Sequence, residues 1–123
     1  GRGSRDFIFV DDVCRGLMAC ALRGEPGDVY NLASGAETTV RSLADAINRL
    51  TGNAAPCRLL PRRPWDHSLH RFGSTVKARE KLGFACEAGL EEGLKKTIAW
   101  TRANLPRIEA TMAKHRDRLR AAG

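Results

Sequence analysis

The sequence predicts a mixed α/β fold (α+β), in which short strands are covered by helices and the helices are in the majority. Apolar residues recur at the 3.6-residue period of amphipathic helices over much of the chain. Runs with the composition of strands are brief, at residues 7–10, 29–32 and 57–60. At 123 residues the chain has the size of one domain and is expected to bury roughly two thirds of its unfolded surface.

The first strand and the first helix are expected near the start of the chain. Residues 7–10 are strand formers, and Asp11 and Asp12 follow as an N-cap with negative charge at a helix N-terminus. This helix ends at Gly24. Residues 29–32 are then expected to form a second strand.

A second helix is expected over residues 40–50, because its apolar positions keep the helical period and Gly52 follows as a stop. Thr38 or Thr39 caps its start. Residues 57–60 lie between two prolines and are expected to form a brief strand.

Residues 61–73 show no usable period and are expected to form a loop, the kind of segment that often carries function. A short helix then begins at Ser74 or Thr75 and ends at Gly83.

The last third of the chain is expected to be helical. An amphipathic helix opens at residue 89, and Pro106 is expected to break or kink it before a terminal helix over residues 108–119. The proline suggests a division into a segment 1–106 and a basic helical tail 107–123. The tail holds five lysines and arginines against two carboxylates.

The net charge of +7 and the pI near 9.8 are compatible with nucleic acid, a phosphorylated ligand or an acidic partner. The sequence has no apolar run of the roughly 20 residues that a membrane span needs. The first four residues also lack the apolar stretch of a signal peptide, so a cytoplasmic protein is expected. The four cysteines have no metal-binding spacing and are expected to be small buried apolar residues.

The predicted loop is the best local candidate for a ligand site. It carries Arg62, Arg63 and Arg71, and arginine presents a planar fork of donors that matches phosphate oxygens. Arg5 joins them if the fold brings the two segments together. Asp66 is a candidate acceptor for sugar hydroxyls. The alternative is that these arginines are solvated surface charges.

Other chemically capable residues are less convincing. Trp65 either lines a pocket or packs into the core. His67 and His70 have no third ligand at useful spacing and follow no nucleophile, so metal binding is not expected. Asp11 and Asp12 resemble a catalytic carboxylate pair, but their place before a helix favours capping.

Five landmarks along the chain, taken in order, resemble one enzyme family: RDFIFVDDV, GDVYNLASG, PRRPWD, KAREKLGF and LEEGLKKTIAW. They are similar to the landmarks of the extended short-chain dehydrogenases/reductases, which include the NAD-dependent nucleotide-sugar epimerases and dehydratases. The arrangement is nearest to the UDP-glucose 4-epimerases. The resemblance implies the C-terminal substrate-binding part of an extended Rossmann-type enzyme.

The resemblance also implies roles for single residues. Arg5 would contact the diphosphate of a nucleotide sugar, and so would Arg63, with Arg62 a near neighbour. Asp66 would meet the nucleotide ribose. Residues 30–32 would belong to the edge of the nucleotide-binding sheet. Trp65 replaces a common glycine in a loop that is about one residue longer than usual, which leaves the sugar open and weakens any claim for Arg71.

The family's glycine-rich NAD motif and its Tyr-x-x-x-Lys pair do not occur in this sequence. Tyr30 is the single tyrosine, and Ser34 stands where the pair would need lysine. The resemblance therefore implies a fragment with no catalytic residues and no metal site, inactive alone. NAD would bind the parent enzyme, and none is expected on this fragment.

The expected partners are a nucleotide diphosphate sugar, the missing N-terminal Rossmann half and further copies of the chain in a homo-oligomer. No membrane partner is expected. The alternative function is a small basic module that binds nucleic acid through phosphate contacts. The low aromatic content of 6% and the lack of a stacking motif weigh against it.

Overall fold

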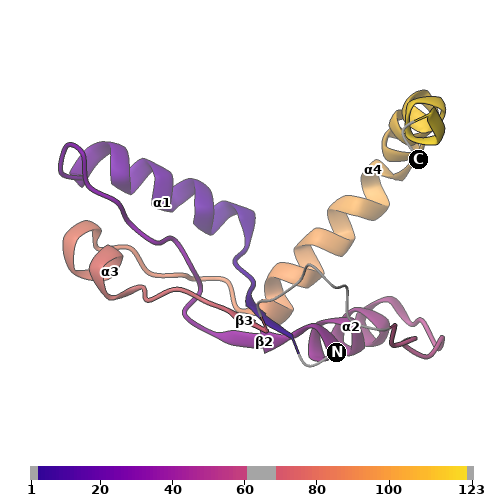
Figure 1. The fold of residues 1–123 in the computed structure, drawn as a ribbon, viewed down its shortest axis with the longest axis horizontal. Helices are drawn as coiled ribbons and strands as arrows, with labels where there is room; N and C mark the ends of the chain where they lie inside the picture. Colours follow the sequence, from indigo (N-terminus) through magenta and orange to yellow (C-terminus); the bar gives the residue numbers. More distant parts are fainter. Residues whose placement is uncertain (1–2, 61–68, 122–123) are drawn as a thin grey trace.

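The computed structural model describes residues 3–60 and 69–121, with side chains described as far as residue 114. The described chain contains helices and strands in the following order (Figure 1): β1 (Ser4–Asp6), α1 (Val10–Arg23), β2 (Glu37–Thr39), α2 (Val40–Thr51), β3 (His70–Arg71), α3 (Val76–Leu82) and α4 (Leu90–Ala121). The predicted mixed fold of short strands and a helical majority is confirmed.

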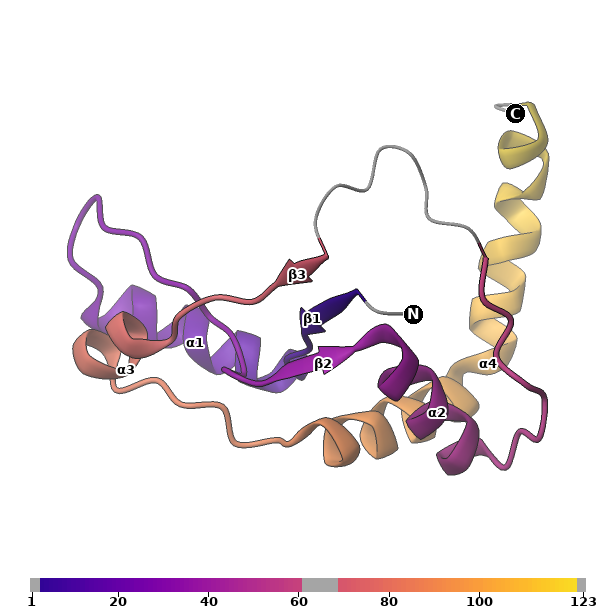
Figure 2. The same cartoon turned by 60° about the horizontal axis from the view of Figure 1, so that its bottom comes forward.

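The three strands form one small sheet in the order β2-β1-β3 (Figure 2). β1 pairs antiparallel with β2, where Arg5 lies opposite Thr38, and parallel with β3, where Arg5 lies opposite Arg71. The central strand therefore joins two segments that lie far from it in the sequence.

The helices form two packed units on either side of the sheet (Figure 1). The α1–α3 unit contains the buried core, which Ala19, Ala78, Leu82 and Phe84 form, and Leu82 is completely buried. In the α2–α4 unit, the first turns of α4 pack against α2. The rest of α4 projects away from the sheet.

The open arrangement leaves much of the chain in solvent. Its accessible surface is 9530 Å², whereas a compact monomer of this mass would expose roughly 6,500 Å². Measured against an unfolded surface of roughly 19,600 Å², folding buries only about half. The prediction that two thirds would be buried is therefore wrong, because α1 packs mainly with α3 and α2 with α4, and the rest of α4 projects away from the sheet.

Helix ends agree with the sequence where local chemistry decides them. The Thr39 side chain caps α2 by accepting a hydrogen bond from the Ser42 backbone N–H at 3.0 Å. Gly52 and Gly83 end α2 and α3 with φ values of 71° and 63°. Both values lie in the left-handed region that glycine adopts without strain. The predicted cap of α2 and the predicted stops of both helices are confirmed, whereas Thr75 precedes α3 without a side-chain cap.

The path of α4 differs from the prediction. The helix continues through Pro106 to Ala121, so the separate terminal helix that was expected to begin near residue 108 is wrong. Proline removes one backbone hydrogen bond, but strong helix formers flank it on both sides and the helix continues. Among the described residues, no helix is both long enough and apolar enough to cross a membrane.

The predicted strands are wrong in position. Residues 7–9 connect β1 to α1, and residues 29–32 and 57–60 form no ladder with any other described segment. The ladders lie instead at residues 4–6, 37–39 and 70–71, the last inside the predicted loop. Composition indicates which residues suit a strand, but pairing needs a partner strand that local sequence does not specify.

Candidate functional site

Arg5 lies at the middle of the central strand. Its Nη1 donates hydrogen bonds to the Ser4 carbonyl at 2.6 Å and to the Leu69 carbonyl at 3.3 Å. The Ser4 backbone N–H also donates to the Leu69 carbonyl, at 2.8 Å. Because Leu69 immediately precedes β3, these bonds hold the Arg5 guanidinium at the junction of β1 and β3.

The register of the sheet brings a second arginine beside Arg5. Arg71 is its partner on β3, and Thr38 is its partner on β2. Directly opposed residues project from the same face of a sheet. One face therefore carries two guanidinium groups and a hydroxyl, and Arg71 is exposed. The sequence offered Arg71 as one arginine of the predicted loop, with a claim weakened by the departures of that loop from the family. No local signal reveals its pairing with Arg5 across the sheet.

The opposite face carries a cluster of Ser4, Glu37 and His70, one from each strand. His70 Nδ1 lies 2.8 Å from Ser4 Oγ and 2.7 Å from Glu37 Oε1, and Ser4 Oγ also donates to Glu37. Hydrogen bonds from Ser4 and His70 hold the pKa of Glu37 below its usual range. Serine and carboxylate contact the same ring nitrogen, so the cluster cannot relay a proton from Ser4 through the ring. It fastens the three strands together.

Asp6 connects the first landmark of the sequence to the second. Its carboxylate accepts hydrogen bonds from the Ser34 backbone N–H at 2.8 Å, the Ser34 hydroxyl at 2.6 Å and the Gly35 N–H at 2.8 Å. Gly35 has a φ of 77°, which glycine adopts without strain. The turn at Ser34 and Gly35 is thus held by a carboxylate, and its amides are already used.

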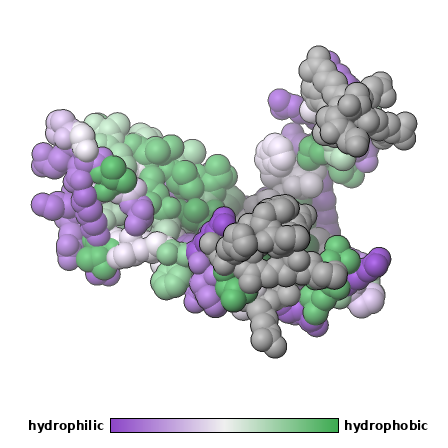
Figure 3. All heavy atoms as spheres, in the orientation of Figure 1, coloured by the Kyte–Doolittle hydropathy of each residue, from purple (hydrophilic) through white to green (hydrophobic). Residues whose placement is uncertain are grey.

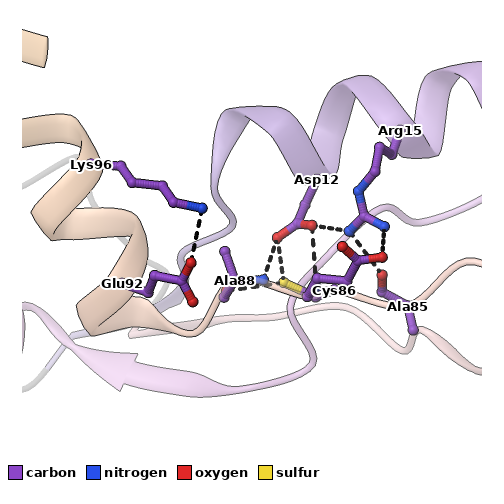
Figure 4. A network of polar contacts seen from close by, with 8 residues as sticks. Asp12, Arg15, Ala85, Cys86, Ala88, Glu92 and Lys96 are labelled. Atoms are coloured by element: carbon purple, nitrogen blue, oxygen red, sulfur yellow. Dashed lines mark hydrogen bonds and ion pairs between the residues drawn. The ribbon is translucent and has the colours of Figure 1, made fainter.

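Asp12 is buried, and its carboxylate joins the start of α1 to the segment before α4 (Figure 4). It accepts hydrogen bonds from the Cys86 thiol at 3.0 Å, the Glu87 N–H at 3.2 Å and the Ala88 N–H at 3.0 Å, and it pairs with Arg15. Burial acts to raise the pKa of Asp12, but these bonds outweigh it and hold the pKa well below its usual range.

This arrangement corrects the roles expected for Asp11 and Asp12. The N-cap of α1 is Phe9, and no side chain caps the helix, so the predicted capping is wrong. Both carboxylates lie in the first turn instead, and only Asp12 is buried. Burial and the Asp12 carboxylate raise the pKa of the Cys86 thiol to about 11, which leaves the thiol protonated near neutral pH.

The other predicted site residues have different outcomes. Arg62, Arg63 and Asp66, together with Trp65 and His67, lie outside the described residues. Within the described part of the chain, no cluster of histidine, cysteine and carboxylate side chains could hold a metal ion. The prediction of buried cysteines is wrong, because Cys14 is exposed and the other three are half-buried.

A hollow of about 550 Å³ lies between the start of α1 and α4, away from Arg5. Phe9, Val10 and Trp100 form much of its lining, and Lys96 lies over the Phe9 ring at 5.4 Å. Trp100 is 59% exposed. This apolar, open hollow has the character of a packing surface more than of a polar ligand site.

Comparisons with known proteins bear on the landmarks. No family model matches the chain. The chain is 33% identical over 105 residues to the dTDP-glucose 4,6-dehydratase of Streptomyces niveus. The alignment covers 85% of this chain and 31% of that protein. It is 32% identical over 108 residues to the UDP-glucose 4-epimerase of Bacillus subtilis, covering 85% of this chain and 32% of the relative.

A solved structure matches over almost the whole chain. The crystal structure of the Bordetella bronchiseptica enzyme WbmF in complex with NAD⁺ and UDP superposes with a TM-score of 0.85 at 52% identity, covering 98% of this chain and 35% of that one. The chain belongs to the extended short-chain dehydrogenases/reductases. The chain spans about a third of the length of these relatives.

Proposed function

We propose that this chain is the nucleotide-sugar-binding, C-terminal portion of an NAD-dependent nucleotide-sugar epimerase or dehydratase, with a 4-epimerase favoured. The observation that carries the proposal is the position of Arg5, whose guanidinium is bound to Leu69 at the end of the segment that carries the other candidate ligands. The names of the relatives, which act on UDP-glucose or dTDP-glucose, support this substrate class.

The proposed ligand contacts follow from charge and geometry. Arg5 and Arg63, with Arg62 beside it, bind the diphosphate, because guanidinium groups match phosphate oxygens bidentately and remain charged. Asp66 accepts hydrogen bonds from the ribose hydroxyls. The residues of the segment 1–106 carry this site, and the tail 107–123 lies outside it.

The hydride chemistry of the family is proposed to depend on residues outside these 123. NAD supplies the hydride acceptor in such enzymes, and a tyrosine accepts the proton. Tyr30 is the single tyrosine of this chain, and its hydroxyl accepts a hydrogen bond from the Glu25 backbone N–H at 3.1 Å. Lys77 lies over its ring at 5.0 Å. Tyr30 thus has a structural role, and catalytic and NAD-binding residues are not assigned to this chain.

The dinucleotide-binding part of such an enzyme is the proposed partner of α1. One face of this helix, the α1 apolar face, consists of Val10, Leu17, Met18 and Leu22, which are 58–75% exposed. Figure 3 shows apolar surface gathered over this helix. The excess of roughly 3,000 Å² of exposed surface over a compact monomer is comparable to a large obligate interface. The face also adjoins the hollow between α1 and α4.

Calorimetric titration of the 123-residue chain tests the proposal. We expect weak binding of UDP-glucose and no binding of NAD, because the proposed sugar-nucleotide ligands belong to this chain whereas the glycine-rich NAD motif does not occur in it. Sub-micromolar NAD binding would contradict the division of roles. Tight binding to generic DNA that falls steeply with added salt would instead favour the basic nucleic-acid-binding module.

A further inference from the structure

We propose that Arg71 is a second diphosphate ligand, which acts together with Arg5 across the β1–β3 pair. The inference rests on the proposed function, because it adds a residue to the same nucleotide-sugar site. It follows from the register of the sheet and requires no contact from residues outside the described ranges.

The first step is the distance between the two arginines. Arg5 and Arg71 are register partners on neighbouring parallel strands. Such strands lie about 4.8 Å apart, and opposed side chains leave from the same face. The two guanidinium groups are therefore attached within reach of one small anion. The Arg5 guanidinium is also bound to the Leu69 carbonyl on the β3 side, which directs it toward the strand that carries Arg71.

The second step is the sorting of charge between the two faces. Asp6 and Glu37 are register partners and alternate with Arg5 and Thr38, so both carboxylates leave from the opposite face. Asp6 is engaged by the turn at Ser34 and Gly35, and Glu37 by Ser4 and His70. The strand residues thus give the arginine face two positive groups and a neutral threonine.

The third step is the energetic effect of an anion. Both guanidinium groups stay charged at neutral pH, so an anion bound between them interacts favourably with each. The planar fork of arginine favours two oxygens at once. A diphosphate carries adjacent negative groups on a flexible bridge, so one phosphate can be bound by each arginine. This chemistry distinguishes the ligand from a single carboxylate.

The test compares single substitutions in the 123-residue chain by NMR titration with millimolar UDP, with uridine as the ligand that lacks phosphate. We expect Arg71→Gln and Arg5→Gln each to weaken UDP binding about tenfold or more. Arg79→Gln removes the same charge from an exposed position on α3 and is expected to change the affinity less than about twofold. Uridine affinity is expected to be equal in all four proteins.

Two further measurements separate ligand contact from folding. Protection of the Ser4 amide, which is bonded to Leu69, is expected to persist in Arg71→Gln and shows that β3 remains in place. Arg71→Lys keeps the charge but lacks the fork, and is expected to lose several-fold in UDP affinity.

Each remaining outcome counts against a specific statement. If Arg71→Gln binds UDP as tightly as Arg79→Gln while Arg5→Gln is weakened, Arg71 is not a ligand and the proposed function survives. If neither Arg5→Gln nor Arg71→Gln weakens binding, or if the unmodified chain shows no response to millimolar UDP, the diphosphate site itself is wrong.

Discussion

Asp12 shows how much of this structure depends on single polar side chains. Its buried carboxylate joins the first turn of α1 to Cys86 and Ala88, which lie 74 and 76 positions further along the chain. Two backbone N–H groups, a thiol and a guanidinium converge on two oxygens. The place of Asp12 in the family landmark is thus explained by its packing contacts.

We predict that Asp12→Asn lowers the free energy of unfolding by about 2 kcal/mol, as expected when a charged acceptor is lost from several buried hydrogen bonds. The NH₂ group of the introduced asparagine would also face groups that themselves donate hydrogen bonds to Asp12. Asp11→Asn is the matched control, because Asp11 is adjacent and exposed, and it is expected to change stability by less than about 0.5 kcal/mol. Urea unfolding followed by circular dichroism measures both. Equal effects of the two substitutions on the free energy of unfolding would show that the buried hydrogen bonds of Asp12 do not stabilise the fold.

The same residue predicts a pH dependence. Because the pKa of Asp12 is lower in the folded chain than in the unfolded chain, its contribution is fully present above the unfolded value of about 3.9. As the pH falls below that value the unfolded chain takes up a proton first, and stability is lost. Unfolding curves between about pH 5 and pH 2 should show this loss in the unmodified chain. Asp12→Asn should show a flatter profile.

Among the structural elements, the small sheet depends on its side-chain cluster. β3 has only two residues, so Ser4, Glu37 and His70 supply much of what holds it against β1. We predict that Glu37→Gln increases the hydrogen-exchange rate of the Ser4 amide, which donates to the Leu69 carbonyl. Glutamine keeps an acceptor oxygen but lacks the negative charge of the carboxylate, so its hydrogen bonds with Ser4 and His70 are weaker. Glu80→Gln, at an exposed position on α3, should leave this rate unchanged. An unaltered Ser4 rate in Glu37→Gln would mean that backbone pairing alone fixes β3.

The sequence predicted helices better than strands for a physical reason. Thr39, Gly52 and Gly83 act on their own helix ends, so a short window of sequence contains their effect. A strand exists only through a partner, and β1 finds its partners more than 30 and 60 positions away. Arg5 was recognised through its motif, whereas the place of Arg71 beside Arg5 is known only from the register.

At the scale of the whole molecule, the exposed α1 apolar face predicts self-association. Burial of apolar surface contributes about 25 cal/mol per Å², so covering this face is favourable for a second copy when no other partner is present. We predict that the chain elutes as an oligomer in size-exclusion chromatography with light scattering. The double substitution Leu17→Gln and Leu22→Gln should shift it toward the monomer.

Leu60→Gln is the control for this experiment, because Leu60 is similarly exposed but lies outside α1. It should leave the oligomer unchanged. A clean monomer that persists on dilution of the unmodified chain would contradict the prediction.

The pairing of β1 with β3 has one practical consequence. Ser4 and His70 are 66 positions apart, and closing a chain of that length costs roughly 4 kcal/mol in entropy. A backbone cut at Gly27, in the open turn after α1, would divide the two arginines between separate polypeptides. The proposed phosphate recognition would then return only when the pieces recombine. On that proposal, the chain offers a starting point for a two-fragment complementation sensor of nucleotides.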